Sequence, residues 1–314
     1  MAEKLVCVAG PTACGKTTLG VLLAQRLGGE VVSVDSMQIY RGMVIGTAAP
    51  TAEEMQGIPH HMVGVADPRE SWSAARYARE SIPVIDDILR RGKRPILVGG
   101  TGLWLDAVVR GHGFAPGKAG GAIRQELQRQ LEETGIEPLF QELRRVDPAA
   151  AERLHPADEK RVLRALEVYR ETGKTITQHN EETKALPPRY DAVWIGLNFA
   201  DRSDLRALID RRVDRMVEQG LLEEIAALVR AGVPREATAL QAIGYKELLG
   251  VLEGTVPLED AVAEVKLRSR QYAKRQLTWL RRNPAIHWIT WEKERDFARA
   301  LQTSTEILSA SGVF

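Results

Sequence analysis

The segment GPTACGKT at residues 10–17 restricts the fold of this 314-residue chain more than any other feature. It matches the pattern G-x-x-x-x-G-K-[ST], in which glycines let backbone N–H groups curl around phosphate oxygens. The apolar run at residues 4–9 predicts a buried strand before it, and residues 16–27 predict a helix after it. Because pattern and context agree, a phosphate-binding loop is favoured over a Gly-rich turn that matches by chance.

The chemistry of this loop predicts a phosphorylated ligand without identifying it. Lys16 can neutralise phosphate charge, and the hydroxyl of Thr17 can help to hold Mg²⁺. The N-terminus of the following helix adds partial positive charge. A loop of this kind occurs in many activities, so the identity of the ligand has to come from other residues.

The remainder of the chain indicates an α/β fold with a parallel sheet covered on both faces. Further short apolar runs predict buried strands at residues 30–34 and 95–98, and residues 192–199 and 286–290 also have strand character. Helical patterns at 74–91 and from 103 towards 110 alternate with them, as βαβ units require. After Asp201 the chain is expected to be helical almost to its end, apart from the last strand.

A change of composition predicts an insertion within this core. Residues 111–121 are rich in Gly and Ala, which is typical of a linker, and residues 122–177 are charged and helical in pattern. We therefore expect a P-loop NTPase-like α/β core at 1–114 and 191–314. The helical insertion would occupy 115–190, and the C-terminal region of the core would be mainly helical.

Bulk properties exclude some classes of protein. A net charge of +1 means that any nucleic-acid surface must come from local clustering of charge. Cys7 and Cys14 match no metal or disulfide pattern, and no apolar run is long enough for a signal peptide or a membrane helix. These features predict a cytoplasmic protein without a membrane partner.

Asp35, at the end of the strand predicted for residues 30–34, is a candidate general base. Ligands gather at the carboxyl ends of parallel strands, so the strands at 4–9 and 30–34 should bring Asp35 close to the phosphate loop. There it could accept a proton from a nucleophile or hold metal-bound water. Asp is equally well suited to capping a turn, and its position alone does not decide between these roles. Thr101 follows another strand, in a Gly-rich turn.

The clearest cluster of basic residues occupies 264–282. On a helix, one stripe would contain Arg268, Tyr272, Arg275, Trp279 and Arg282. Cations attract RNA phosphates and aromatic rings stack on bases, although the rings could instead pack inwards beneath solvated arginines. A second basic run at 160–164 is diluted by acids and favours a solvated helix face. His60 and His61 are expected in a loop, without a functional role.

Together these segments resemble the tRNA dimethylallyltransferase family. The resemblance is carried by GPTACGKT (10–17), SVDSMQIYRGMVIGTA (33–48), ILVGGTGLW (96–104), RVLRALEVYRETGK (161–174), AIGYKEL (242–248) and AKRQLTWLR (273–281). It implies a P-loop core whose helical insertion grips the anticodon stem-loop. It also implies transfer of a dimethylallyl group from dimethylallyl diphosphate to N6 of the adenosine immediately 3′ of the anticodon, with tRNA as partner and a monomeric enzyme.

The same resemblance assigns roles to individual residues. Asp35 would be the general base, Thr101 would lie beside the reacting groups, and Lys16 would stabilise the leaving diphosphate, with Mg²⁺ on Thr17. The diphosphate would be held by Gly10, Pro11, Thr12, Ala13, Cys14, Gly15, Lys16 and Thr17, most directly by the last six. The tRNA would be bound by Asp35, Ser36, Met37, Gln38, Thr101, Arg124, Lys160, Arg161, Val162, Leu163, Arg164, Gln241, Ala242, Ile243, Gly244, Tyr245, Lys246, Lys274, Arg275, Gln276, Leu277, Thr278, Trp279, Leu280 and Arg281.

Three other functions compete with this interpretation. A small-molecule kinase would share the loop and the strand-end Asp, but does not require the basic segment near the C-terminus. An adenylate isopentenyltransferase would prenylate free AMP, ADP or ATP. A non-catalytic RNA-binding protein would not bind dimethylallyl diphosphate.

Overall fold

The computed structural model describes residues 4–111 and 121–313. The chain divides into two compact units. The first comprises Met1–Gly111 and Arg189–Phe314, and the second comprises His112–Pro188. These bounds differ by a few residues from the core and insertion expected from the sequence.

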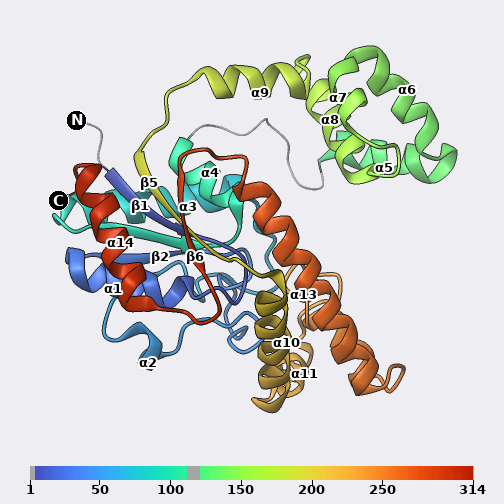
Figure 1. Cartoon of the computed structure of the whole chain (residues 1–314). Coiled ribbons are helices and arrows are strands. Elements are labelled where there is room, and N and C mark those ends of the chain that lie inside the picture. The colour runs from blue at the N-terminus through green and yellow to red at the C-terminus, as the bar shows by residue number, and fades with distance from the viewer. Residues whose placement is uncertain (1–3, 112–120, 314) are drawn as a thin grey trace. The chain divides into compact units, whose positions relative to one another are not determined.

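A six-stranded, entirely parallel sheet forms the centre of the first unit (Figure 1). Its spatial order is β3-β2-β4-β1-β5-β6. In the middle, Val8 of β1 is in register with Val98 of β4 on one side and with Ile195 of β5 on the other. The strands are β1 (Lys4–Ala9), β2 (Glu30–Val34), β3 (His60–His61), β4 (Pro95–Gly99), β5 (Asp191–Phe199) and β6 (Ile286–Trp291). The predicted parallel α/β class is confirmed.

One expectation about the sheet is wrong, and the strand order adds a detail that the sequence did not predict. β4 lies between β1 and β2, so the strand that ends at Asp35 is not the immediate neighbour of the strand before the phosphate loop. Sequence order gave no sign of this, because a crossover helix can skip a position in the sheet. His60 and His61 form the short edge strand β3 rather than a loop, and the Nε2 atom of His61 lies 2.7 Å from Glu30 Oε2.

Helices cover both faces of this sheet. The long helix α3 contains Pro83 and remains one continuous helix. Among the described residues, no helix is long and apolar enough to cross a membrane. The helices of the first unit are α1 (Lys16–Leu27), α2 (Ala52–Met55), α3 (Ala74–Arg90), α4 (Gly102–Arg110), α10 (Arg202–Glu218), α11 (Leu221–Arg230), α12 (Tyr245–Leu252), α13 (Leu258–Leu280) and α14 (Phe297–Ala310).

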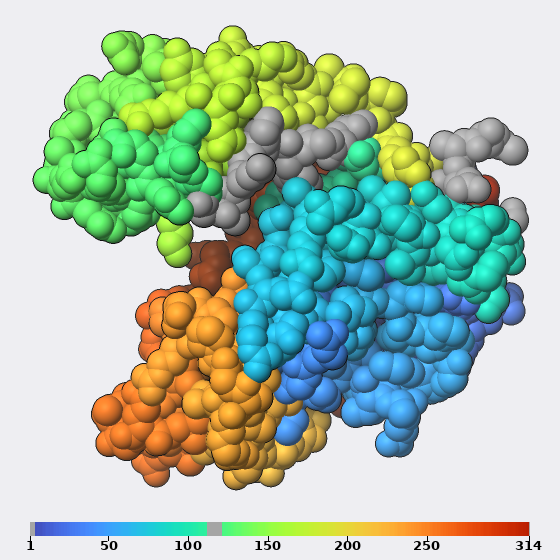
Figure 2. Space-filling view, turned by 180° about the vertical axis from the view of Figure 1, so that it is seen from behind, coloured from blue at the N-terminus to red at the C-terminus, as the bar shows by residue number. Residues whose placement is uncertain are grey.

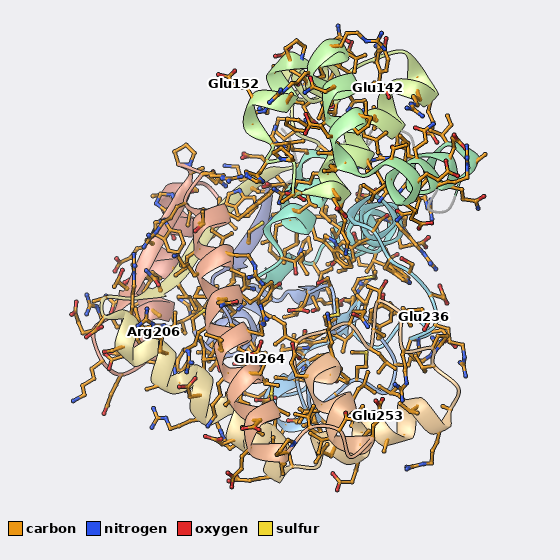
Figure 3. All side chains as sticks on the ribbon, turned by 90° about the vertical axis from the view of Figure 1, so that its right-hand side faces the viewer. Glu142, Glu152, Arg206, Glu236, Glu253 and Glu264 are labelled. Atoms are coloured by element: carbon orange, nitrogen blue, oxygen red, sulfur yellow. The ribbon has the colours of Figure 1, made fainter. Side chains whose placement is uncertain are left out.

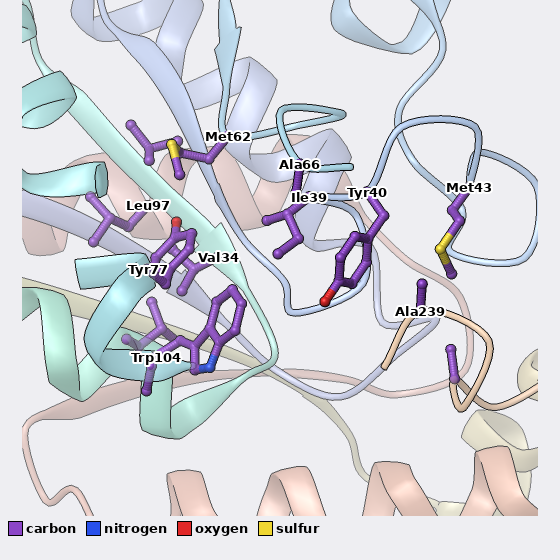
Figure 4. Close-up of a cluster of buried hydrophobic side chains, with 14 of the residues drawn as sticks. Val34, Ile39, Tyr40, Met43, Met62, Ala66, Tyr77, Leu97, Trp104 and Ala239 are labelled. Atoms are coloured by element: carbon purple, nitrogen blue, oxygen red, sulfur yellow. The ribbon is translucent and has the colours of Figure 1, made fainter. Parts of the chain in front are cut away.

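The alternating side chains of β1 separate two hydrophobic cores. Leu5 and Cys7 point to the core formed with α3 and α4, whereas Val6 and Val8 point to the core formed with α1 and α14. In the first core Tyr77 stacks on Trp104 at 4.4 Å between ring centroids, and its hydroxyl donates to a backbone carbonyl of β2 at 2.5 Å (Figure 4). This stacking fixes α3 and α4 against the strands that carry the site.

The second unit is a small helical bundle with its own core. Its helices are α5 (Ala122–Thr134), α6 (Ile136–Val146), α7 (Pro148–Arg153), α8 (Glu159–Thr172) and α9 (Ile176–Ala185). Leu127, Phe140 and Leu166 are buried together at its centre. The charged, helical pattern therefore predicted this part of the chain correctly. The Gly-rich segment assigned to a linker lies largely outside the described residues.

Candidate active site

The phosphate loop connects β1 to α1, and parts of its backbone adopt left-handed conformations that are unfavourable for residues with a Cβ atom. Gly15, at the N-cap of α1, has φ of 92°, a left-handed conformation that glycine adopts without strain. Ala13 has φ of 65° despite its Cβ atom. The ammonium of Lys16 donates to the carbonyl of Pro11 at 2.7 Å, across the loop. Cys14 is fully buried and burial raises the pKa of its thiol, so only its backbone can face a ligand.

Residues distant in sequence hold this loop in place. The indole N–H of Trp291, at the end of β6, donates to the carbonyl of Cys14 at 2.9 Å. On the other side the amide of Gln276 in α13 accepts from the Thr12 N–H at 2.9 Å and donates to the Gly100 carbonyl at 3.1 Å. A Cβ atom on Gly100 would lie 2.2 Å from Gln276 Nε2, so a larger residue there would displace the Gln276 amide. Gln276 thus ties α13 to the phosphate loop.

Asp35 both caps a turn and faces a cavity, so its two sequence-based interpretations are compatible. Its Oδ1 atom accepts from the N–H groups of Met37 at 2.9 Å and Gln38 at 3.4 Å. The hydroxyl of Thr101 accepts from the Ser36 N–H at 3.3 Å, which joins the loops after β2 and β4. The Asp35 side chain is partly exposed and lines the cavity described next.

A cavity of about 270 Å³ brings the phosphate loop and Asp35 together despite the intervening strand. Thr12 and Asp35 both line it, as do Arg212 of α10 and Tyr272 and Arg275 of α13. This volume is near the lower end of the roughly 300–1,000 Å³ common for small-ligand pockets. Part of its wall is apolar and consists of Met37, Ile209, Val213, Met216, Leu221, Ile243 and Val265.

Arg212 is a site residue that the sequence analysis missed, and Tyr272, predicted only as part of the basic stripe, also lines the cavity. Desolvation lowers the pKa of the Arg212 guanidinium, and the charge of Asp35 opposes that shift. Burial, assisted by the Asp35 charge, raises the pKa of Tyr272 to about 12, so its hydroxyl stays protonated at neutral pH. Arg212 follows Leu205 and Ile209 on the apolar face of α10, and a cation at a core-facing position was the available signal.

One wall of the cavity is a loop fixed by a single carboxylate. Glu224 of α11 accepts from the N–H groups of Val44 at 2.7 Å, Ile45 at 2.8 Å and Gly46 at 3.1 Å. The buried hydroxyl of Tyr245 donates to the same carboxylate at 2.5 Å. Figure 2 shows blue segments of the N-terminal half meeting the orange region of α11 and α12 on this face. Tyr245 therefore helps to fix this loop through Glu224, although the sequence analysis assigned it to the RNA surface.

The basic stripe on α13 is divided between the cavity and the core. Arg275 lies over the ring of Tyr272 at 5.6 Å, beside the cavity. The indole N–H of Trp279 donates to Asp106 at 3.0 Å, and its ring lies so close that a Cβ atom on Gly102 would be 2.0 Å from it. Trp279 thus packs inwards, as the alternative interpretation of the stripe required, while Lys274, Thr278 and Arg281 are exposed.

Several residues assigned to the RNA surface have buried side chains in this structure, and their contact with RNA stays a prediction. Helical periodicity turns every third or fourth residue of a continuous motif inwards, and a resemblance over the whole motif does not separate the two faces. The buried residues are Val162, Leu163, Ala242, Tyr245, Gln276, Leu277 and Leu280. Gln241, Ile243, Lys246, Ser36 and Gln38 are exposed or partly exposed.

In the second unit two of the assigned cations face a buried acid. Arg164 Nη1 lies 2.9 Å and Arg124 Nη1 lies 4.0 Å from Oε2 of Glu167, whose side chain is 5% exposed. Lys160 and Arg161 are exposed on the same helix, and Arg161 pairs with Asp158 at 3.1 Å. Arg124 and Arg164 therefore have a role in charge balance within this unit, whatever else they bind.

The phosphate loop has a donor set compatible with Mg²⁺. Mg²⁺ is usually held by one or two protein oxygens together with substrate phosphates and water. Thr17, at the start of α1, provides a partly exposed hydroxyl of this kind. Among the described residues no cluster of three or more His, Cys, Asp or Glu side chains could hold a metal by itself, so substrate oxygens would have to complete the site.

Fold and site together define a P-loop α/β protein whose phosphate loop and strand-end carboxylate line one cavity. Comparison with protein families agrees. Residues 38–283 match the IPP transferase family and residues 3–63 match isopentenyl transferase. The chain is 47% identical to a tRNA dimethylallyltransferase of Halalkalibacterium halodurans over 92% of this chain and 91% of the relative. It is 46% identical to that of Geobacter sulfurreducens over 93% and 94%.

Solved structures give the same result. A tRNA isopentenylpyrophosphate transferase from Bacillus halodurans matches with a TM-score of 0.72 at 42% identity, covering 99% of this chain and 98% of that one. A eukaryotic dimethylallyltransferase acting on tRNA matches with a TM-score of 0.83 at 32% identity, covering 98% and 80%. The chain belongs to the IPP transferase family.

Proposed function

We propose that this protein transfers a dimethylallyl group from dimethylallyl diphosphate to N6 of the adenosine immediately 3′ of the anticodon in tRNA, releasing diphosphate. The observation that carries the proposal is the single cavity lined by Thr12 of the phosphate loop and by Asp35. Membership of the IPP transferase family supports it. We expect the protein to act as a cytoplasmic monomer.

In this proposal the loop between β1 and α1 holds the diphosphate of the donor. Lys16 would exchange its contact with the Pro11 carbonyl for phosphate oxygens, and the first N–H groups of α1 would add donors. Mg²⁺, bound by Thr17 and diphosphate, would neutralise charge on the leaving group. The apolar wall of the cavity, including Val213 and Met216, would enclose the hydrocarbon of the donor.

The nucleophile is an adenine that has to leave the base stack to enter the cavity. The bond between donor carbon and diphosphate oxygen breaks, and its electron pair leaves with the diphosphate. The lone pair of N6 forms the new carbon–nitrogen bond, and Asp35 accepts the proton lost from N6. Because the N6 amine of neutral adenine is a weak nucleophile, positioning by Thr101 and Tyr272 would matter greatly.

Incubation with labelled dimethylallyl diphosphate and unmodified tRNA, followed by nucleoside analysis, tests the proposal. Label in N6-prenylated adenosine is the expected result. Parallel reactions with AMP, ADP and ATP as acceptors test an adenylate isopentenyltransferase. ATP consumption without RNA would indicate a small-molecule kinase, and a donor that does not bind at all would indicate a non-catalytic RNA-binding protein.

The role of Asp35 needs a substitution that preserves its turn. Asp35→Asn retains an oxygen that can accept from the Met37 and Gln38 N–H groups, but it cannot serve as the base. We expect single-turnover rates to fall about 10²-fold or more, with tRNA affinity nearly unchanged. Asp35→Ala removes both functions and gives the matched comparison. A rate close to that of the wild type for Asp35→Asn would exclude general-base catalysis by this residue.

A further inference from the structure

Residues 43–48 form part of the cavity wall, and we call them the wall loop. Three consecutive N–H groups of this loop donate to the carboxylate of Glu224 in α11. They belong to Val44, Ile45 and Gly46, at 2.7, 2.8 and 3.1 Å. Successive N–H groups that converge in this way form a site for an anion, and here the anion belongs to the chain itself. Because α11 packs on α12 and α12 packs on α13, the carboxylate has firm support; Figure 3 marks the end of α12 by Glu253 and α13 by Glu264.

Near its end the wall loop presents one backbone carbonyl to two side chains of the site. The Thr47 carbonyl accepts from Gln38 Nε2 at 3.3 Å and from Arg212 Nη2 at 3.5 Å. Thr47 itself lines the cavity. Its hydroxyl donates to the Met43 carbonyl at 2.6 Å, which closes the loop on itself. The Thr47 carbonyl therefore connects the wall loop both to the segment after β2 and to α10.

Of these two side chains, Arg212 depends more on the carbonyl. In the described part of the chain its guanidinium has Thr47 as its one hydrogen-bond acceptor and no carboxylate within 4.0 Å. Desolvation lowers the pKa of this guanidinium, so the protein alone stabilises its charge poorly. A bond of 3.5 Å is weak, and the guanidinium keeps its direction only while the carbonyl keeps its place. An anionic ligand in the cavity would be the stronger partner of a cation held in this way.

We propose that Glu224 is a positioning residue, which acts through the wall loop to keep Arg212 directed at the phosphorylated ligand of the site cavity. Glu224 lies behind the cavity wall: of the residues that the structure describes, Gly46 and Thr47 line the cavity and Glu224 does not. The inference rests on the proposed function only in taking dimethylallyl diphosphate as that ligand.

Electrostatics gives this proposal a distinctive sign. Removing an acid close to an anion site reduces repulsion, so on charge alone the loss of Glu224 should strengthen binding of a phosphorylated ligand. If Glu224 acts by positioning, its loss lets the wall loop and Arg212 move, and binding becomes weaker. A purely stabilising role would leave the affinity of the folded protein unchanged. Affinity for a phosphate compound therefore separates all three roles.

Four substitutions provide the test. Glu224→Gln removes the charge and leaves one side-chain oxygen for the loop. Glu223→Gln is the matched control, because it removes the same charge from the exposed preceding residue of α11. Arg212→Gln and its combination with Glu224→Gln complete a double-mutant cycle. Tyr245→Phe is milder, since it deletes one hydrogen bond to Glu224 and keeps the charge. Calorimetric titration with inorganic diphosphate in the presence of Mg²⁺ measures affinity, and thermal unfolding checks that each variant is folded.

Glu224→Gln should bind inorganic diphosphate about 5- to 10-fold more weakly than the wild type, and Tyr245→Phe about 2- to 3-fold more weakly. Glu223→Gln should bind as tightly as the wild type or slightly more tightly. The double variant should be no weaker than Arg212→Gln alone, because the loop then has no guanidinium to place. Unchanged or tighter binding by Glu224→Gln, equal weakening by Glu223→Gln, or single losses that multiply in the double variant would overturn the proposal.

Two further arrangements keep the test decisive. If Glu224→Gln does not fold, the same cycle is run with Tyr245→Phe in its place. Nucleoside analysis of the wild type with dimethylallyl diphosphate and tRNA separates the two hypotheses. If prenylated adenosine forms but the cycle shows no coupling, the positioning role fails and the proposed function stands. If the cycle shows coupling but no prenylated adenosine forms, the positioning role stands and the proposed function fails.

Discussion

Replacing Gln276 by methionine separates positioning of the phosphate loop from RNA binding. Methionine has a similar length and volume but makes neither hydrogen bond of the amide, so the Thr12 N–H and the Gly100 carbonyl lose their partner. Thr12 is partly exposed and can bind water, whereas Gly100 is buried. We therefore expect a loss of about 1–3 kcal/mol in the free energy of unfolding. The displaced loop should lower kcat/KM for dimethylallyl diphosphate about 10- to 100-fold.

Urea unfolding and donor titrations at saturating tRNA measure these two effects. Gln219, an exposed glutamine after the end of α10, provides the control Gln219→Met, which should change neither quantity. The affinity of Gln276→Met for tRNA should stay within a factor of two or so, since its side chain is buried. Weaker tRNA binding with unchanged donor constants would show that Gln276 is an RNA contact after all, and the argument from its hydrogen bonds would be refuted.

Further predictions concern the RNA surface, the cavity wall and acid stability. Neutralising Arg275 and Arg282 should weaken tRNA binding and flatten its salt dependence, and an affinity that stays equally salt-sensitive would contradict this. Gly46→Ala should cost about 1–3 kcal/mol in urea unfolding, because its Cβ atom would lie 2.4 Å from the buried ring of Tyr245. Hydrogen bonds from Arg91, then from Lys93 and His61, hold the pKa of buried Glu30 well below its usual range. That stabilisation is present above the unfolded pKa of about 4.3 and is lost as pH falls below it. Glu30→Gln should therefore unfold more easily at pH 7, by about 2 kcal/mol, with the difference shrinking in acid.

The sequence predicted the strands well because this sheet is buried on both faces. Short, uninterrupted apolar runs that end at Gly-rich turns, such as those of β1 and β4, are typical of buried parallel strands. The edge strand β3 was missed because it contains only His60 and His61, and its polar partner Glu30 belongs to another strand. The spatial order of the strands could not be predicted from the sequence either. Local patterns define each βα unit but contain no information on which position a crossover fills.

Site residues could be predicted where one short segment contains all the functional groups. They could not be predicted where tertiary contacts determine which side chains face the site. The phosphate loop needs a fixed local sequence, so residues 10–17 were sufficient to find it. In 273–281, by contrast, one helical turn contains both exposed Lys274 and buried Gln276. Both fall in the same motif, and only packing against Gly100 reveals that the glutamine faces the phosphate loop.

Arg212 could have been identified from the sequence as a candidate site residue. A charged residue at the apolar positions of an amphipathic helix is costly to bury unless a ligand or a counter-charge compensates it. Its position three residues after Ile209 and one before Val213 meets that description, and the structure places it in the cavity wall within the electrostatic reach of Asp35. The same logic separates it from Arg270, which faces α10 but is neutralised by Asp210 at 2.7 Å. A core-facing cation without an ion-pair partner among the described residues is therefore the more informative sign of an anionic ligand, and in this chain it lines the same cavity as Thr12 of the phosphate loop.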